Sequence, residues 1–84
     1  MLGGLVAASP ASAARSCTNW QDGMTFGISC SQYDSAQYVQ AVARCTNGET
    51  VWGSWAKIGD GSWSYAYCSS WPGASLGEGW FNIK

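Results

Sequence analysis

Several residue types on which common functions depend are absent or scarce in this chain of 84 residues. It contains no histidine, which excludes histidine-bearing zinc sites, Ser-His triads and imidazole acid–base chemistry. Charge is sparse and scattered: four Lys and Arg stand against five Asp and Glu, so the basic stripe of a nucleic-acid binder is missing. No apolar run approaches the ~18 residues of a membrane span.

Cysteine is present in an informative pattern. Cys17, Cys30, Cys45 and Cys68 form an even set behind a short apolar leader that ends in Ala11-Ser12-Ala13-Ala14. An even count in a short chain indicates a disulfide framework, which persists in oxidising compartments. We therefore expect all four thiols to be in bridges, with no thiol nucleophile and no thiolate metal site. The predicted location is extracellular.

The leader predicts the domain boundary. Its apolar run, Leu2–Ala8, followed by small residues, resembles the core and cleavage site of a signal peptide. No Lys or Arg precedes Arg15, so we interpret residues 1–14 as a signal peptide truncated at its N-terminus. The alternative is a disordered tail of a cytosolic protein. Residues 15–84 are predicted to be a single secreted domain, expected to be monomeric.

Strand-like patterns run through that domain. Apolar and small residues alternate over Met24–Cys30, and β-rich runs at Gln37–Cys45 and Thr50–Lys57 flank an Asn47-Gly48 corner. Asn-Gly is a strong signal for a two-residue type I′ hairpin, which would set Ala43 opposite Trp52 with both on the core face. Two further strands are expected, at Ser62–Cys68 and Gly79–Lys84.

The cysteine positions constrain how these strands are arranged. Strands two apart in one sheet lie ~9.5 Å apart, whereas bridged Cα atoms lie within ~7 Å. A three-strand meander therefore forbids a bond between Cys45 and Cys68. Either the third strand crosses into a second sheet or the pairing is not sequential, and we favour the crossing. The predicted fold is all-β: a small disulfide-stapled antiparallel sandwich, or a barrel-like domain, of five to six strands.

Aromatic residues give the main indication of function. Trp63, Tyr65 and Tyr67 share one face of a predicted strand, and Ala66 and Cys68 share the other. If Cys68 faces the interior, the three rings form an exposed aromatic platform of the kind that marks a binding site. The alternative is that the rings are the core and the small residues face water.

Trp55, on the outward face of its own predicted strand, is expected to join this platform. The carboxylates are interpreted as solvated turn charges rather than as catalytic pairs, because so small a domain offers little concavity for a glycosidase site. These carboxylates are Asp22, Asp34, Glu49, Asp60 and Glu78. We predict that the chain is not an enzyme and has no cofactor.

Three segments carry a family resemblance. Ala43-Arg44-Cys45-Thr46-Asn47-Gly48, Val51-Trp52-Gly53-Ser54-Trp55 and Ser64-Tyr65-Ala66-Tyr67-Cys68 resemble small secreted four-cysteine proteins of Streptomyces-like actinobacteria, a group without an assigned activity. More distantly, the layout is similar to that of the proteinaceous α-amylase inhibitors of such bacteria, which implies six strands in two sheets with sequential bridges. Their inhibitory Trp-Arg-Tyr motif is absent, since this chain has Trp20-Gln21-Asp22 in that interval.

Two function classes follow from these features. The first is a secreted module that binds carbohydrate or a cell-envelope polymer through aromatic rings, because flat apolar sugar faces can lie on such rings. The second is a secreted protein-binding effector, either an enzyme inhibitor or a bacteriocin-like protein, that uses rigid aromatic anchors. The expected partner is therefore a polysaccharide or an extracellular protein.

Overall fold

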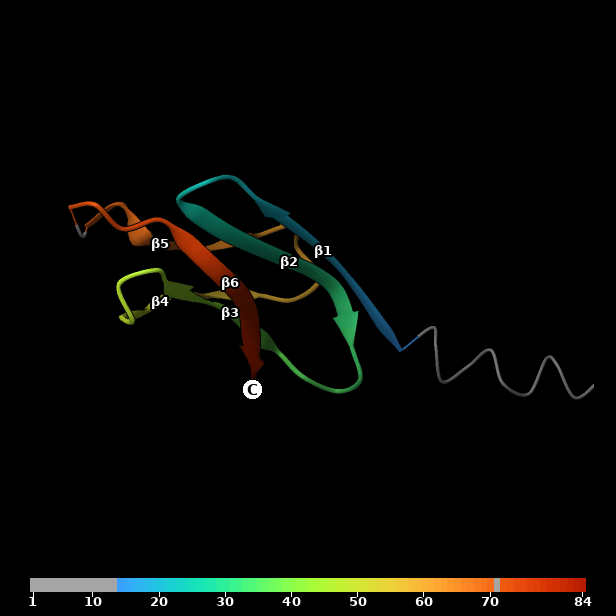
Figure 1. Cartoon of the computed structure of the whole chain (residues 1–84). Helices are drawn as coiled ribbons and strands as arrows, with labels where there is room; N and C mark the ends of the chain where they lie inside the picture. The colour runs from blue at the N-terminus through green and yellow to red at the C-terminus, as the bar shows by residue number, and fades with distance from the viewer. Residues whose placement is uncertain (1–13, 71) are drawn as a thin grey trace, which may run out of the picture.

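The structure is a computed structural model that describes residues 14–70 and 72–84, so the predicted signal peptide lies outside the described residues except for Ala14. Six antiparallel strands form two three-stranded sheets (Figure 1), with the orders β1-β2-β5 and β4-β3-β6. The strands are β1 (Arg15–Gln21), β2 (Thr25–Tyr33), β3 (Tyr38–Cys45), β4 (Thr50–Lys57), β5 (Ser64–Tyr67) and β6 (Leu76–Ile83). The prediction of an all-β domain of two sheets is confirmed.

The core lies between the two sheets and is made of small and medium side chains. Phe26 and Ile28 of β2 face Val39 and Ala41 of β3, and all four are at most 5% exposed. The ring of Phe26 packs directly on Gly79 of β6, where a Cβ atom would collide with it. Phe26, Ile28 and Cys30 point into the core, as the predicted alternation of β2 requires, but Thr25 and Gly27 on the opposite face are also buried, Gly27 beneath the ring of Tyr65.

The two disulfides join neighbouring cysteines in the chain. Cys17 and Cys30 face each other across β1 and β2 with Cα atoms 4.0 Å apart. Cys45 and Cys68, with Cα atoms 5.6 Å apart, connect the end of β3 to the residue after β5 and so tie the two sheets together. The crossing of the third strand into a second sheet is confirmed, and each bridge contributes about 3 kcal/mol on a chain-entropy model.

The turn between β3 and β4 differs from the prediction. Gly48 has a positive φ of 91°, whereas Asn47 does not, so the two-residue type I′ turn is wrong. The Gly48 N–H donates to the Cys45 carbonyl (2.9 Å) and the Cys45 N–H donates to the Glu49 carbonyl (2.8 Å), which closes a three-residue loop. The Asn47 side chain accepts a hydrogen bond from the Glu49 N–H (3.0 Å) and so favours this longer turn.

The longer turn shifts the pairing of the hairpin by one residue. Near the turn, Ala43 lies opposite Val51 and not opposite Trp52 as predicted. Farther along, the predicted register returns, with Gln40 opposite Trp55. The two registers are reconciled by one extra residue in β4, which is a β-bulge.

The bulge is stabilised by a buried side chain from the other sheet. Gly53 and Ser54 together lie opposite Ala41, and Ser64 of β5 reaches between the two strands. Its hydroxyl accepts a hydrogen bond from the Ala41 N–H (2.8 Å) and donates one to the Ser54 carbonyl. Gly53 permits this approach because a Cβ atom there would collide with the backbone of Tyr65. The hydroxyl thus replaces the ladder rung that the bulge removes.

The bulge also decides which way the tryptophans of β4 point. Trp52 and Trp55 are three residues apart, and the extra residue places both on the outer face of their sheet. The prediction that Trp52 belongs to the core is therefore wrong, since 59% of its surface is exposed.

Candidate ligand-binding groove

The aromatic residues in β5 and immediately before it point outward. Trp63, Tyr65 and Tyr67 are 38%, 36% and 49% exposed, whereas Ser64 and Ala66 between them are 1% and 0% exposed. The alternative in which these rings form the core is wrong. The reason is that Ser64 must reach the bulge while Ala66 faces the closely approaching second sheet, which leaves only the outer face for the rings.

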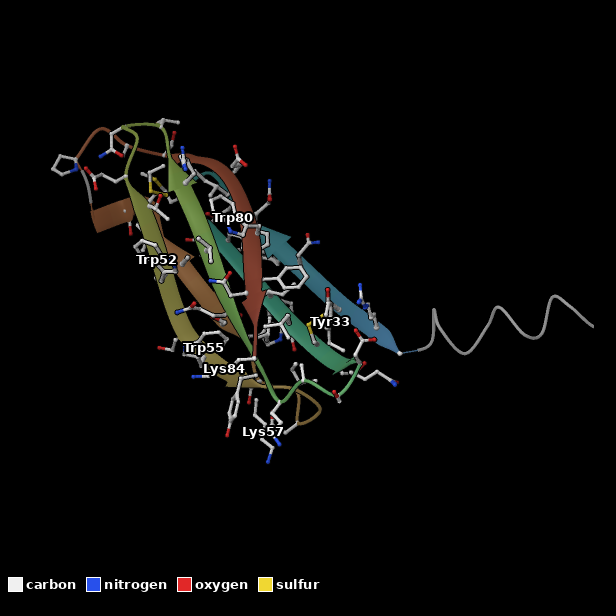
Figure 2. The ribbon with its side chains drawn as sticks, turned by 90° about the horizontal axis from the view of Figure 1, so that it is seen from below. Tyr33, Trp52, Trp55, Lys57, Trp80 and Lys84 are labelled. Carbon is white, nitrogen blue, oxygen red and sulfur yellow. A yellow bond between two sulfur atoms is a disulfide. The ribbon has the colours of Figure 1, made fainter. Side chains whose placement is uncertain are left out.

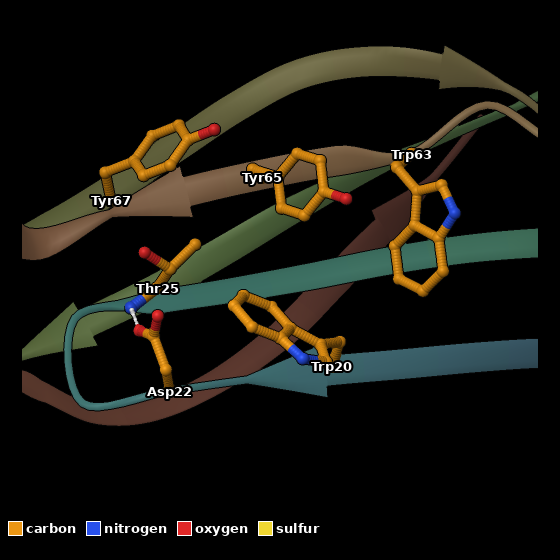
Figure 3. A pocket seen from close by; sticks show the side chains of 6 residues that line it. All are labelled: Trp20, Asp22, Thr25, Trp63, Tyr65 and Tyr67. Atoms are coloured by element: carbon orange, nitrogen blue, oxygen red, sulfur yellow. Dashed lines mark hydrogen bonds between the residues drawn. The ribbon is translucent and has the colours of Figure 1, made fainter.

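The three rings form a row with a defined orientation (Figure 3). The planes of Trp63 and Tyr65 are 11° apart with ring centroids separated by 5.9 Å. The rings of Tyr65 and Tyr67 are separated by 6.1 Å and tilted by 30°. At a centroid distance of 5.9 Å, the nearly parallel rings of Trp63 and Tyr65 are stacked with a lateral offset, so part of each face stays available to a ligand.

Tyr65 is seated by a row of residues that crosses the sheet. The ring lies over Gly27 of β2, where a Cβ atom would come within 2.6 Å of a ring carbon. Gly27 in turn pairs with Trp20 of β1, whose indole meets Tyr65 edge-on with centroids 6.4 Å apart and planes at 85°. A side chain at Gly27 would push Tyr65 away from Trp20, so the glycine sets the shape of the site.

Trp20 was not among the predicted site residues. All seven residues of β1 are exposed, so the strand has no alternating pattern from which it could be predicted. No local signal in the sequence connects Trp20 with Tyr65, because their proximity depends on the pairing of β2 with both β1 and β5.

A polar corner closes one end of the row. Asp22 lies in the turn between β1 and β2, where one carboxylate oxygen accepts hydrogen bonds from the N–H groups of Met24 (2.8 Å) and Thr25 (2.9 Å). Thr25 pairs with Tyr67 across the sheet. Together these side chains border an open groove of about 590 Å³, which we call the aromatic groove. Its lining residues are Trp20, Asp22, Thr25, Trp63, Tyr65 and Tyr67.

Trp55, the fourth residue of the predicted platform, lies elsewhere. It belongs to β4, and Figure 2 shows it on the outer face of the β4-β3-β6 sheet with Trp52, Trp80 and Lys84. The Lys84 ammonium nitrogen is 4.4 Å from the centroid of the Trp55 ring. The prediction of one platform that contains Trp55 is wrong, because β4 and β5 belong to different sheets.

The aromatic residues on this outer face cover part of the central strand, β3. Val42 points outward from β3 but is only 1% exposed, and it lies in register between Trp52 of β4 and Trp80 of β6. In the next row, the Gln40 side chain donates to the Gly53 carbonyl (3.0 Å) and accepts a hydrogen bond from the Asn82 amide (3.1 Å). Trp52 and Trp80 therefore cover Val42 on this face, although Trp52 itself is 59% exposed.

The perturbed ionisable groups lie outside the aromatic groove. The guanidinium of Arg15 forms an ion pair with Asp34 (2.8 Å), and the pKa of Arg15 is raised above its ordinary value by that hydrogen bond. The pKa of Asp60 is lowered by hydrogen bonding with Ser62 in its turn. Within residues 14–70 and 72–84, no group of three or more acidic or cysteine side chains is arranged to hold a metal ion. In the same residues, no helix is long and apolar enough to cross a membrane.

Comparison with protein-family models, with curated proteins and with solved structures finds no match for this chain. The resemblance to secreted actinobacterial proteins and to α-amylase inhibitors therefore stays a prediction. The geometry of the aromatic groove is what bears on function.

Proposed function

We propose that this domain is a secreted binding module whose aromatic groove holds carbohydrate or a cell-envelope polymer. The observation that carries the proposal is the pair of nearly parallel, exposed rings of Trp63 and Tyr65. A pyranose ring has an apolar face of C–H bonds, which fits against an aromatic face, and a rim of hydroxyl groups, which needs polar partners. Asp22 offers such a partner at the edge of the groove.

The groove is also built on rigid elements. Tyr65 and Tyr67 lie on a hydrogen-bonded strand, and the contact of Tyr65 with Gly27 fixes where its ring lies. Side chains held in place before binding lose little conformational entropy when a ligand arrives, so their contacts contribute more to affinity. The volume of about 590 Å³ lies in the range of ligand pockets in proteins.

The proposed location outside the cell is supported by the disulfides. Bridges between Cys17 and Cys30 and between Cys45 and Cys68 occupy every described cysteine. Reducing agents of the cytosol open such bonds, and a domain of this size buries too little apolar surface to depend on its core alone. The disulfides therefore support a protein that works in an oxidising environment.

The test compares retention on insoluble polymers with thermal stability. Trp63→Ala and Tyr65→Ala are compared with wild type on amorphous cellulose, amorphous chitin and purified bacterial cell wall. We expect wild type to be retained on at least one of these and each variant to lose about tenfold in affinity, equivalent to about 1.4 kcal/mol. Their melting should change little, because truncating exposed side chains rarely costs much stability.

The matched control is Trp52→Ala, which removes an exposed tryptophan from the opposite sheet and should leave retention unchanged. Wild-type retention that survives both groove substitutions would overturn the proposal. So would a wild-type protein that none of the three polymers retains, a result that favours an extracellular protein target. A loss of ~3–5 kcal/mol in stability would instead assign the rings a core role.

A further inference from the structure

We infer that the ligand of the aromatic groove is a single, extended chain of neutral, all-equatorial pyranose units of the cellulose or chitin type, with one unit on each ring of the row Trp63, Tyr65 and Tyr67. This inference rests on the proposed function and narrows it. It predicts that the groove binds a free polymer chain rather than a crystalline surface, and a neutral polymer rather than an anionic one. The spacing of the rings, the tilt of Tyr67 and the charge of the groove each support one part of this inference.

The spacing of the rings supports one sugar per ring. Side chains two residues apart on a strand project to the same face at intervals of about 6.6 Å. The centroids of neighbouring rings are accordingly 5.9 Å and 6.1 Å apart. Consecutive pyranose units of an extended β-1,4-linked chain repeat at a comparable distance, so three units can stack on the three rings together.

The stereochemistry of the sugar follows from the shared direction of the rings. In such an extended chain, successive units are turned over, so a row of rings on one face meets alternating faces of the sugars. All-equatorial units carry axial hydrogens on both faces and can stack in either orientation. A unit with an axial hydroxyl has one face that stacks poorly, which would leave alternate rings without a good partner.

The tilt of the third ring distinguishes a chain from a crystal. Trp63 and Tyr65 are nearly parallel, at 11°, but Tyr67 is tilted by 30° from Tyr65. A crystalline face is flat and rigid, so it can lie flush on the first two rings but not on the third. A free chain rotates about its glycosidic bonds and can follow the turn. The right-handed twist of β-strands favours such a progressive rotation along the row.

The side wall of the groove also suits a single chain. Trp20 stands edge-on to Tyr65, at 85°, and projects beside the row from β1. A polymer sheet wider than one chain would meet this indole, whereas one chain can lie along β5 with its edge against it.

Charge at the groove disfavours anionic polymers. Among the described residues, Asp22 is the only acidic one that lines the groove, and none that lines it is a cation. Arg15, on the neighbouring strand β1, is paired with Asp34, and Lys84 lies over Trp55 on the opposite sheet. A uronate or phosphate polymer would therefore meet a carboxylate and find no counter-charge. Neutral hydroxyl and acetamido groups can instead donate hydrogen bonds to Asp22.

The first experiment measures affinity against chain length. Isothermal titration of wild type with cello- and chito-oligosaccharides of two to six units should show about a fivefold gain from two units to three for one of the series. Little further gain is expected beyond three. Tyr67→Ala should remove the gain at three units while preserving the affinity for two, and Trp52→Ala should behave as wild type.

The second experiment compares polymers with the same backbone. Affinity electrophoresis in hydroxyethylcellulose, or glycol chitin for a chitin binder, should retard wild type, with an affinity about tenfold above that for the carboxymethylated polymer. Asp22→Asn should narrow this difference. The amide oxygen can still accept the turn hydrogen bonds from Met24 and Thr25, so the substitution removes charge while keeping the turn.

Three results would each overturn the inference: equal affinity for two and six units, equal or higher affinity for the carboxymethylated polymer, and binding to microcrystalline but not to soluble material. Each leaves the proposed function standing if retention on insoluble polymers still depends on Trp63 and Tyr65. Retention that is independent of those rings overturns the proposed function itself, so the two failures are distinguishable.

Discussion

Replacing Ser64 with alanine removes one hydroxyl that bridges the two sheets. Ser64 is 1% exposed, and its hydroxyl accepts a hydrogen bond from the Ala41 N–H and donates its own hydrogen to the Ser54 carbonyl. In the variant Ser64→Ala, both backbone groups lose this partner. The bulge in β4 prevents a normal ladder rung from taking its place.

The expected loss of stability follows from the two backbone groups that lose their hydrogen-bond partner. A buried polar group left without a hydrogen bond costs about 1–3 kcal/mol; the Ala41 N–H is buried but the Ser54 carbonyl is only part-buried and can be partly solvated, so the variant should lose about 2–4 kcal/mol. This is a large share of the ~5–15 kcal/mol that stabilises a small domain. At ~4–8 °C per kcal/mol for a domain of this size, Tm should fall by roughly 10–30 °C.

The assay is denaturant unfolding and calorimetry of wild type, Ser64→Ala and the control Ser54→Ala. Ser54 is exposed and contributes its carbonyl rather than its side chain to the bridge, so its substitution should change stability by less than ~0.5 kcal/mol. A second measurement, amide exchange in wild type, should show strong protection of the Ala41 N–H. Equal stability of the two variants, or rapid exchange at Ala41, would refute the reasoning.

Two further predictions concern the turn and the bridges. Gly48→Val should destabilise the domain by about 1–2 kcal/mol, because its φ of 91° is costly for a residue with a Cβ atom. Gly23→Ala, at a site with free space and no positive φ, is the control, and equal effects in denaturant unfolding would contradict the argument. The non-reduced protein should have an intact mass about 4 Da below that of the reduced protein, two hydrogens per bridge. Detection of a free thiol in the natively purified protein would count against the framework.

The hairpin of β3 and β4 shows where local reasoning succeeds and where it fails. The two strands follow from composition and alternation, whereas Gln40 lies opposite Trp55 as predicted only because the bulge cancels the slip at the turn. The turn type does not follow from the local sequence. The Asn-Gly dipeptide permits both a two-residue and a longer loop, and the Asn47 side chain and the positive φ of Gly48 favour the longer one. One residue of slip then reverses the face of every β4 side chain up to the bulge, so Trp52 points outward and not into the core as predicted.

The candidate site was predicted in part for a comparable reason. Trp63, just before β5, and Tyr65 and Tyr67 within it alternate with small residues, so their shared face can be predicted from the sequence. Whether that face lies on the surface or in the core could not be predicted from the sequence, because it depends on how closely Ser64 and Ala66 approach the second sheet.

The sequence by itself determined the all-β class, the even cysteine set and the row of rings at Trp63, Tyr65 and Tyr67, since each depends on neighbours along the chain or on composition. The tertiary structure decided the rest: Trp20 beside Tyr65, Trp55 on the opposite sheet, and Ser64 in the bulge. These are relations between strands distant in sequence, and strand order and bulges set them. The two-residue alternation along a strand determines which side chains share a face. Only the packing of the two sheets determines which face is exposed to water.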